Sequence, residues 1–153
     1  MVNAPAMTAD EPPAGRLLGT THRFPVRVYF EDTDLSGVVY HANYLRWMER
    51  ARSDFLGCVG IDQRAAFDAG EGVYAIADLS IRYLAPARLG DAVLVVSVVA
   101  RVRSASVVIQ QTVSRGSQKL TQAQVTAAFV SPGGRPRRQP AAWVHAFQAM
   151  IED

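Results

Sequence analysis

The segment over residues 30–44 concentrates the side chains of this chain that could do chemistry. It holds the acids Asp32 and Asp34, followed by Gly37 and His41, between a strand-like stretch and a helix-like stretch. Such a loop can present a carboxylate to a ligand beside the unpaired backbone N–H groups at a helix start. An ionised aspartate at that place could act as a general base or as a nucleophile.

The hydrophobic pattern predicts the two elements that hold this loop. Apolar residues alternate with polar ones over residues 24–30, which predicts a strand that ends where the loop begins. Residues 43–56 carry apolar side chains at helical spacing, which predicts a long amphipathic helix. Asn43 is its expected N-cap and Gly57 its expected stop. The loop should therefore lead directly from a strand into a helix.

The second half of the chain has the two-residue period of strands, with one expected face formed by the odd-numbered residues from 73 to 83. The four long stretches of this kind cover residues 73–83, 94–102, 107–113 and 119–129. Because the turns between them are short, neighbouring stretches should pair antiparallel. We expect an α+β fold in which a single curved sheet of about five strands wraps around the long helix. The free edge of such a sheet favours pairing with a second copy.

Shorter helices are predicted over residues 61–69 and 140–151, the second docked by Trp143 and Phe147. Residues 1–20 are expected to form a disordered tail before a single domain over residues 21–153. The tail lacks the pattern of a secretory signal, and no apolar run is long enough to span a bilayer. These observations favour a cytoplasmic protein, and peripheral attachment at the inner membrane stays open.

Composition and spacing argue against several other functions. The net charge of +2 and the short basic cluster at residues 135–138 do not favour nucleic-acid binding. The single cysteine, Cys58, cannot form an internal disulfide, and we expect it to be a small buried residue in a reducing compartment. No spacing of His, Cys and acids suggests a metal site, and the chain lacks a Gly-x-Ser-x-Gly elbow. His22 and His145 are expected to have no chemical role.

The motif Asp32-Thr33-Asp34-x-x-Gly37-Val38-Val39-Tyr40-His41-x-Asn43-Tyr44 resembles the active-site signature of hotdog-fold thioesterases. The resemblance is to the 4-hydroxybenzoyl-CoA thioesterase type, and most closely to the acyl-CoA thioesterases of the Tol–Pal-associated (YbgC-like) branch. The run Glu49-Arg50-Ala51-Arg52 and the stretch over residues 79–91 agree with the family as well. Inside the loop, Leu35-Ser36 replaces the Ala-Gly pair often found there, which removes no functional side chain.

The resemblance implies a hotdog fold that dimerises through the sheet edge and often pairs further into homotetramers. It implies hydrolysis of an acyl-CoA, or of an acyl carrier protein thioester, to a carboxylate and a free thiol. It makes Asp34 the base or nucleophile and His41 the assisting group, with a backbone N–H near His41 as the oxyanion donor. No cofactor is implied, because coenzyme A is part of the substrate. The residues expected to bind substrate are Gly37, Tyr40, Ala42, Asn43, Tyr44 and Arg88.

Other readings of these residues stay open. Asp34 could simply cap a turn, and Asp32 is expected to order the loop by local hydrogen bonds or to pair with an arginine. Glu49 is a minor candidate acid, although helical salt pairing with Arg46 and Arg52 explains it more simply. Arg88 and the arginines at 135, 137 and 138 are candidates for binding the phosphates of coenzyme A. The alternative functions are a hotdog dehydratase of hydroxyacyl thioesters and a non-catalytic module that binds acyl thioesters.

Overall fold

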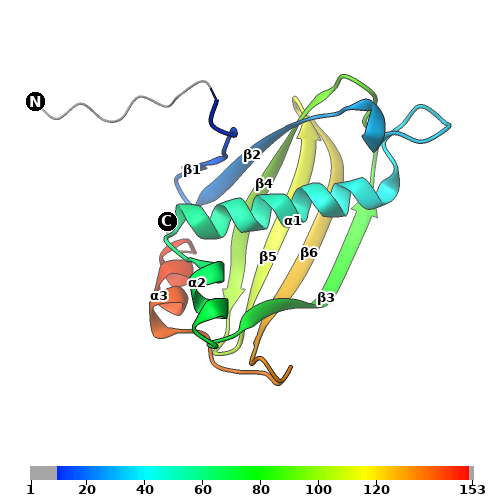
Figure 1. Ribbon diagram of the computed structural model, residues 1–153. Coiled ribbons are helices and arrows are strands. Elements are labelled where there is room, and N and C mark those ends of the chain that lie inside the picture. The colour runs from blue at the N-terminus through cyan, green and yellow to red at the C-terminus, as the bar shows by residue number, and fades with distance from the viewer. Residues whose placement is uncertain (1–9, 152–153) are drawn as a thin grey trace, which may run out of the picture.

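A single antiparallel sheet curves around one long helix, α1 (His41–Cys58), in the computed structural model, which describes residues 10–151 (Figure 1). The strands are β1 (Arg16–Leu18), β2 (Thr21–Arg27), β3 (Val73–Tyr83), β4 (Ala92–Val102), β5 (Ser106–Arg115) and β6 (Gln118–Val130). Their order across the sheet is β1-β2-β4-β5-β6-β3. The expected α+β architecture is confirmed, with six strands rather than about five.

The additional strand is β1, which pairs antiparallel with β2 through Arg16↔Arg23 and Leu18↔Thr21. It lies within the stretch that the sequence analysis assigned to a disordered tail, so the predicted tail extended too far along the chain. The strand has only three residues, which is too short for a two-residue period to be recognised. Residues 1–9 of the expected tail lie outside the described residues.

The helix α1 begins two residues earlier and ends two residues later than expected. Tyr40 occupies the N-cap position without a side-chain cap hydrogen bond, so the prediction that Asn43 is the N-cap is wrong. Gly57 lies inside the helix, and the chain turns away at Gly60, which has a φ of +83°. A left-handed residue of this kind is the usual helix stop.

The exposed edge strand β3 contains a β-bulge between Ile76 and Asp78. The bulge shifts the alternation, because an extra residue moves every later side chain to the other face. Before it, Tyr74 points inward and its ring lies 5.4 Å from that of Phe129. After it, the odd-numbered Ile81 packs on the core. The odd-numbered residues of β3 therefore do not share one face as expected.

The core has two parts, one under each half of α1. The first joins the start of α1 to β2 and β4 and contains Phe24, Tyr44, Trp47 and Met48, among others. The second joins the end of α1 to α3 (Ala141–Ala149), whose Phe147 is fully buried. The short helix α2 (Gln63–Asp68) and α3 lie at that end of α1, and both confirm the sequence prediction.

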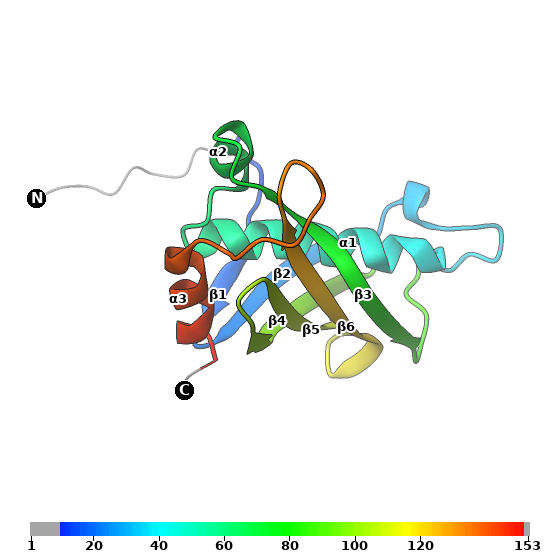
Figure 2. The same ribbon diagram turned by 90° about the horizontal axis from the view of Figure 1, so that it is seen from below.

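Figure 2 shows that α2 and α3 lie at one end of α1, while the loop over residues 30–40 projects at the other end. The packed end is therefore structural, and the loop end is left open to solvent. None of the helices in the described range is long and apolar enough to cross a bilayer.

Candidate active site

The loop before α1 is held at its base by Asp32. The strand β2 ends at Arg27, and a 3₁₀ turn, η1 (Phe30–Asp32), follows, so Phe30 is not part of a strand as expected. The Asp32 carboxylate accepts the backbone N–H of Tyr29 at 2.8 Å. Its carbonyl oxygen accepts the backbone N–H of Tyr40 at 2.9 Å and the side-chain amide of Asn43 at 2.7 Å. Asp32 therefore orders the loop through local hydrogen bonds, and the side chain of Asn43 joins the loop to α1.

Above this base the loop forms a tight hairpin with Asp34 near its tip. The backbone N–H of Asp34 donates to the carbonyl of Val38 at 3.0 Å, and that of Gly37 donates to the carbonyl of Asp34 at 3.1 Å. Gly37 has a φ of +83°, a conformation that favours glycine. Val38 also pairs with Arg88 across an isolated bridge, which ties the hairpin to the turn before β4. The backbone of Asp34 is thus fixed, while its side chain is exposed.

Two hydrogen bonds from Ser36 hold the Asp34 carboxylate. The backbone N–H of Ser36 donates to Oδ1 at 2.8 Å, and its hydroxyl donates to the same oxygen. These bonds, the hydroxyl one first, lower the pKa of Asp34, and the nearby His41 adds a smaller electrostatic contribution in the same direction. Asp34 is therefore ionised at neutral pH, as a base or a nucleophile must be.

The loop leads directly into the start of α1 (Figure 1), where the described residues leave backbone donors unpaired. Among residues 10–151, no acceptor faces the N–H groups of His41 and Ala42. These groups carry the positive end of the helix dipole. An oxyanion placed there would be stabilised by preorganised donors, as thioester hydrolysis requires.

A cavity of about 300 Å³ opens beside the helix start. Its walls include His41, Tyr44 and Tyr83, and its remaining lining is Val39, Leu84, Ala85 and Pro86. The lining is largely apolar, which suits an acyl group. The Tyr44 hydroxyl is buried and accepts the backbone N–H of Ala87 at 2.9 Å, and burial raises the pKa of Tyr44. Asp34 lies on the adjoining loop rather than in the wall of this cavity.

The other residues predicted to bind substrate lie around the same helix start. Tyr40 is exposed, and its ring lies 4.5 Å from that of His41. Ala42 contributes one of the free N–H groups. Asn43 is 5% exposed, and Arg46 donates to its Oδ1 at 2.8 Å, which gives it a structural role. Arg88 is exposed beside the hairpin.

The loop with the arginines at 135, 137 and 138 follows β6, which pairs with the start of β3. The helix start is tied to the opposite end of β3 through Tyr83. Because β3 has 11 residues, its ends are roughly 35 Å apart. Within one chain, these arginines and Asp34 are therefore not brought together.

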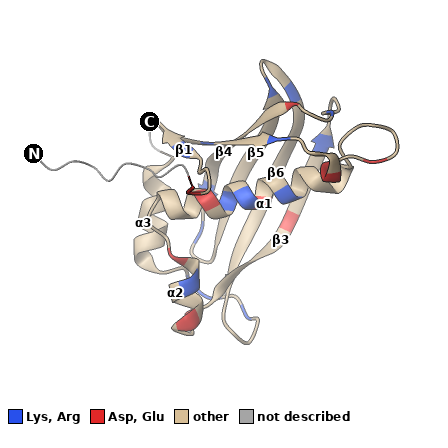
Figure 3. Cartoon of the chain, turned by 45° about the horizontal axis from the view of Figure 1, so that its top comes forward, with Lys and Arg blue, Asp and Glu red and all other residues tan. Residues whose placement is uncertain are grey.

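Glu49 is exposed on α1, a helix that carries both basic and acidic residues (Figure 3). Among the described residues Glu49 forms no ion pair within 4.0 Å. Burial lowers the pKa of Arg52 and the charge of Glu49 acts against this, so the expected pairing with Arg52 is present only as a longer-range attraction. Arg52 instead donates to the buried Gln111 at 2.8 Å, which anchors α1 to β5. Glu49 lies about 12 Å along α1 from His41, and therefore away from the free N–H groups of the helix start.

Comparison with known proteins decides the family. The model of the family described as "Thioesterase superfamily" matches residues 36–122. The chain belongs to the thioesterase superfamily. It is 37% identical to acyl-CoA thioesterase YbgC of Haemophilus influenzae over 117 residues, which are 76% of this chain and 86% of that protein.

Solved structures agree with this assignment. A probable thioesterase from Bartonella henselae superposes with a TM-score of 0.74 at 32% identity, over 78% of this thioesterase and 99% of that chain. The 4-hydroxybenzoyl-CoA thioesterase from Pseudomonas sp. strain CBS-3 superposes with a TM-score of 0.75 at 21% identity, over 82% of this chain and 98% of that one. The second likeness shows the fold alone, and together they confirm the expected hotdog fold.

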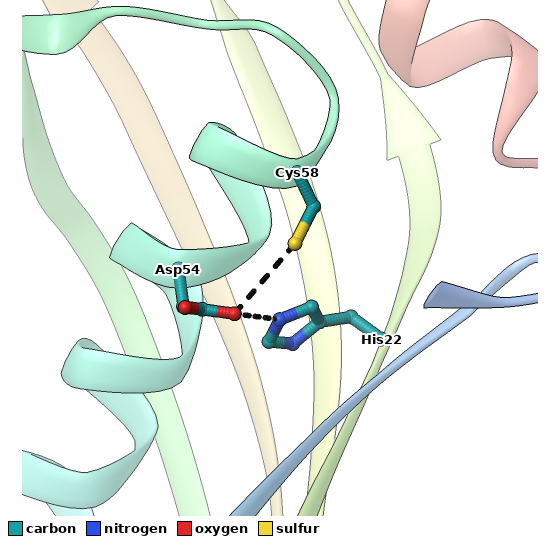
Figure 4. Close-up of side chains that lie close together, drawn as sticks. All are labelled: His22, Asp54 and Cys58. Carbon is teal, nitrogen blue, oxygen red and sulfur yellow. Dashed lines mark hydrogen bonds and ion pairs between the residues drawn. The ribbon is translucent and has the colours of Figure 1, made fainter. Parts of the chain in front are cut away.

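The sequence analysis missed one polar cluster of this thioesterase, formed by His22, Asp54 and Cys58 (Figure 4). His22 is fully buried, and its Nε2 lies 2.6 Å from Oδ2 of Asp54. The backbone N–H of Gly15 and the Cys58 thiol, which is exposed rather than buried as expected, also donate to that oxygen. His22 alternates in step with the inward-facing Phe24, which is the signal that could have revealed it.

This cluster serves the fold rather than the chemistry. Its donor atoms lie within 4.8 Å of one another, a spacing that could suit a cation. However, Oδ2 of Asp54 already accepts hydrogen bonds from three groups, and the cluster lies toward the α3 end of α1. The cluster therefore ties β2 and the segment before β1 to the second half of the helix.

Proposed function

We propose that this protein is an acyl-CoA thioesterase, which hydrolyses the thioester of an acyl-CoA to a carboxylate and a free thiol. The observation that carries the proposal is the ionised Asp34 carboxylate on the loop that leads into α1, where the N–H groups of His41 and Ala42 have no acceptor among residues 10–151. Relatives named as acyl-CoA thioesterases, 37% identical to this chain, support it. An acyl carrier protein thioester offers the same reacting bond and is the second candidate donor.

Asp34 would act in one of two ways. As a general base it would take a proton from water, whose oxygen bonds to the acyl carbon while the carbon–sulfur bond breaks. As a nucleophile it would bond to the acyl carbon itself, expel the thiolate and leave a mixed anhydride that water then hydrolyses. In both routes the N–H groups of His41 and Ala42 stabilise the oxyanion. The thiolate takes up a proton, and we assign its delivery to His41.

Single-turnover hydrolysis in water labelled with oxygen-18 can identify the nucleophilic route. A label on Asp34 after the first turnover requires a mixed anhydride that water attacks at the Asp34 carbonyl carbon. A label in the carboxylate product instead fits the general base, and it also fits water attack on the acyl carbon of the anhydride, so trapping of the acyl-enzyme then separates these two.

A homodimer through β3 would complete the site. The edge of β3 that faces away from β6 has no partner among the described strands, and Val73, Ile76 and Tyr83 on this strand are exposed. A two-fold axis across this edge would pair the two copies of β3 antiparallel. The end that carries Val73 would then meet the partner's end that carries Tyr83. The loop over residues 131–138 of one copy would lie near the Asp34 loop of the other, where its arginines could bind the phosphates of coenzyme A.

The smallest working unit is therefore a dimer, and we propose that two dimers associate further into a tetramer. We also propose a cytoplasmic location, because acyl-CoA is an intracellular substrate. No cofactor or metal is assigned to the reaction, since the carboxylate and the helix start supply its groups.

The test is hydrolysis of a panel of aliphatic and aromatic acyl-CoAs by the wild type and by Asp34→Asn. The reaction is followed by loss of the thioester absorbance, because the exposed thiol of Cys58 would react with a thiol reagent. Asp68→Asn is the matched control, since Asp68 is exposed on α2 and, within residues 10–151, forms an ion pair with Arg64 alone. The proposal expects activity in the wild type and the control and a loss of at least 100-fold, about 2.7 kcal/mol, in Asp34→Asn.

Equal rates in the wild type and Asp34→Asn would remove Asp34 from the mechanism. No hydrolysis of any thioester by the wild type would support the non-catalytic binding module. An assay for hydration of an enoyl thioester tests the dehydratase alternative in the same samples.

A further inference from the structure

We propose that Ser36 is a positioning residue, which holds one oxygen of the Asp34 carboxylate so that the other oxygen faces the water or acyl group. This inference rests on the proposed function of Asp34. Ser36, together with Leu35, replaces the Ala-Gly pair often found at this place in the family.

The geometry separates the two oxygens of the carboxylate. Both donors of Ser36, its backbone N–H at 2.8 Å and its hydroxyl, act on Oδ1 of Asp34. Among residues 10–151, no donor reaches Oδ2. The hairpin bonds to Val38 and from Gly37 fix the backbone of Asp34, so the Ser36 bonds decide where the side chain points. One oxygen is therefore anchored and the other is left for chemistry.

The hydroxyl also favours the ionised form of the carboxylate. A hydrogen bond donated to a carboxylate favours its ionised form, and the Ser36 hydroxyl is the largest cause that lowers the pKa of Asp34. A glycine at position 36 would keep the backbone donor and lose the hydroxyl. This chain therefore has a second donor on its reacting carboxylate, which should extend activity toward lower pH.

A purely structural role would look different. Aspartate side chains often accept the N–H two residues later simply to shape a turn. In that case, removal of the hydroxyl would weaken the loop at every pH alike. If Ser36 positions and ionises Asp34, its loss must instead change the pH dependence of the reaction.

The first experiment measures kcat/KM against pH for the wild type, Ser36→Ala, Ser36→Gly and Ser36→Thr. Loss of the hydroxyl should move the acid limb, which is the fall in kcat/KM at low pH, to higher pH. The alanine and glycine variants should therefore lose more activity at low pH than on the pH-independent plateau. Ser36→Thr keeps a hydroxyl and should restore the wild-type limb. An acid limb in Ser36→Ala that coincides with that of the wild type would overturn the proposal.

Thr33→Val is the matched control for loosening of the loop. The Thr33 hydroxyl donates to the carbonyl of Phe30 at 2.8 Å and, among the described residues, forms no hydrogen bond with the Asp34 carboxylate. Its loss should leave the acid limb in place whatever it does to the rate. A limb that moves equally in Thr33→Val would show that loop strain, not Ser36, controls the carboxylate.

A second experiment does not depend on activity. Carbon-13 NMR of the labelled carboxyl group follows the titration of Asp34 in the wild type and in Ser36→Ala. The pKa of Asp34 should be higher in the variant, and equal values would reject the inference even in a folded, active protein. If Asp34→Asn is fully active, the proposed catalytic role of Asp34 fails, and this titration still decides whether Ser36 controls the Asp34 carboxylate.

Discussion

The hydroxyl of Tyr83, the last residue of β3, donates to the carbonyl oxygen of His41, the first residue of α1, over 2.9 Å. Their rings also meet edge to face, with centroids 6.2 Å apart. This contact ties the edge strand to the helix start. The cavity wall and the free N–H groups of the helix are therefore held in one arrangement.

Replacing Tyr83 with phenylalanine tests this tie. The ring that lines the cavity stays, and the hydrogen bond to His41 is lost. Because the bond is partly exposed, the free energy of unfolding should fall by at most about 1 kcal/mol, measured by urea denaturation. The kcat/KM should fall by more than the small increase in the unfolded fraction explains. An unchanged kcat/KM would show that the hydrogen bond from Tyr83 does not position the helix start.

The pair formed by His22 and Asp54 should contribute to stability and not to catalysis. Asp54→Ala leaves the buried Nε2 of His22 unpaired, which should cost about 1–3 kcal/mol in the free energy of unfolding. His22→Phe leaves Asp54 without its main donor. The double variant contains neither group, so no buried partner is left unpaired. The two losses should therefore not add, and the coupling energy should be about 1 kcal/mol or more. Additive losses in urea denaturation would contradict a direct interaction.

Gly15 should tolerate no side chain, because it lies directly over this pair. A Cβ atom there would lie 2.6 Å from the carbonyl oxygen of Arg23 and 2.7 Å from Oδ2 of Asp54. Gly15→Ala must therefore move the segment before β1 away and lose the Gly15–Asp54 hydrogen bond. We expect the free energy of unfolding to fall by about 1–3 kcal/mol, measured in urea. Gly57→Ala is the control, since its Cβ would meet nothing within 4 Å and alanine favours a helix.

Much of the fold could be predicted from the sequence, because hydrophobic periodicity reports which face of an element is buried. The four long strands and α1 are long enough for their hydrophobic periods to repeat several times, so the periods can be recognised in the sequence. Two features carry no such signal. The strand β1 is too short, and the bulge at Ile76/Asp78 depends on the pairing with β6 rather than on any local pattern.

The candidate site could be located from the sequence but not built. The motif predicts Asp34 and His41 as site residues, and the structure places His41 at the start of α1 and Asp34 on the hairpin that leads into it. The hydrogen bonds that organise the loop depend on backbone geometry instead. The replacement by Leu35-Ser36 was expected to remove no functional side chain, and the sequence did not reveal that Ser36 donates twice to the Asp34 carboxylate. Asn43 was read as a helix cap, yet it is buried and closes the loop onto Asp32.

Asp91 should stabilise the protein in a pH-dependent way. Its carboxylate accepts the backbone N–H of Arg88 at 2.8 Å and a guanidinium N–H of Arg115 at 2.6 Å. These contacts, the Arg88 bond first, lower the pKa of Asp91 below its usual range. A carboxyl group whose pKa is lowered by folding contributes stability above its unfolded pKa of about 3.9, and this contribution disappears as the pH falls through the folded value.

Asp91→Asn should therefore be less stable than the wild type at pH 7, by about 1 kcal/mol because the pair is partly exposed. The difference should vanish in acid, where the wild-type carboxylate is protonated. Urea denaturation at a series of pH values measures it. A gap between the two proteins that stays constant from neutral to strongly acid pH would contradict the assigned contacts.

The β3 edge should hold two copies together, and Ile76→Lys should separate them. Ile76 is 47% exposed in one chain, so lysine there should change the free energy of unfolding of a monomer by less than about 0.5 kcal/mol. In a dimer across this edge the same lysine would be buried without a counter-charge, which is costly. Sedimentation velocity should show a smaller species for Ile76→Lys, with reduced hydrolysis. Leu18→Lys is the control, because Leu18 is 52% exposed on β1 at the opposite edge, and its variant should keep the wild-type size. A wild type that sediments as a monomer at full activity would remove the dimer from the mechanism.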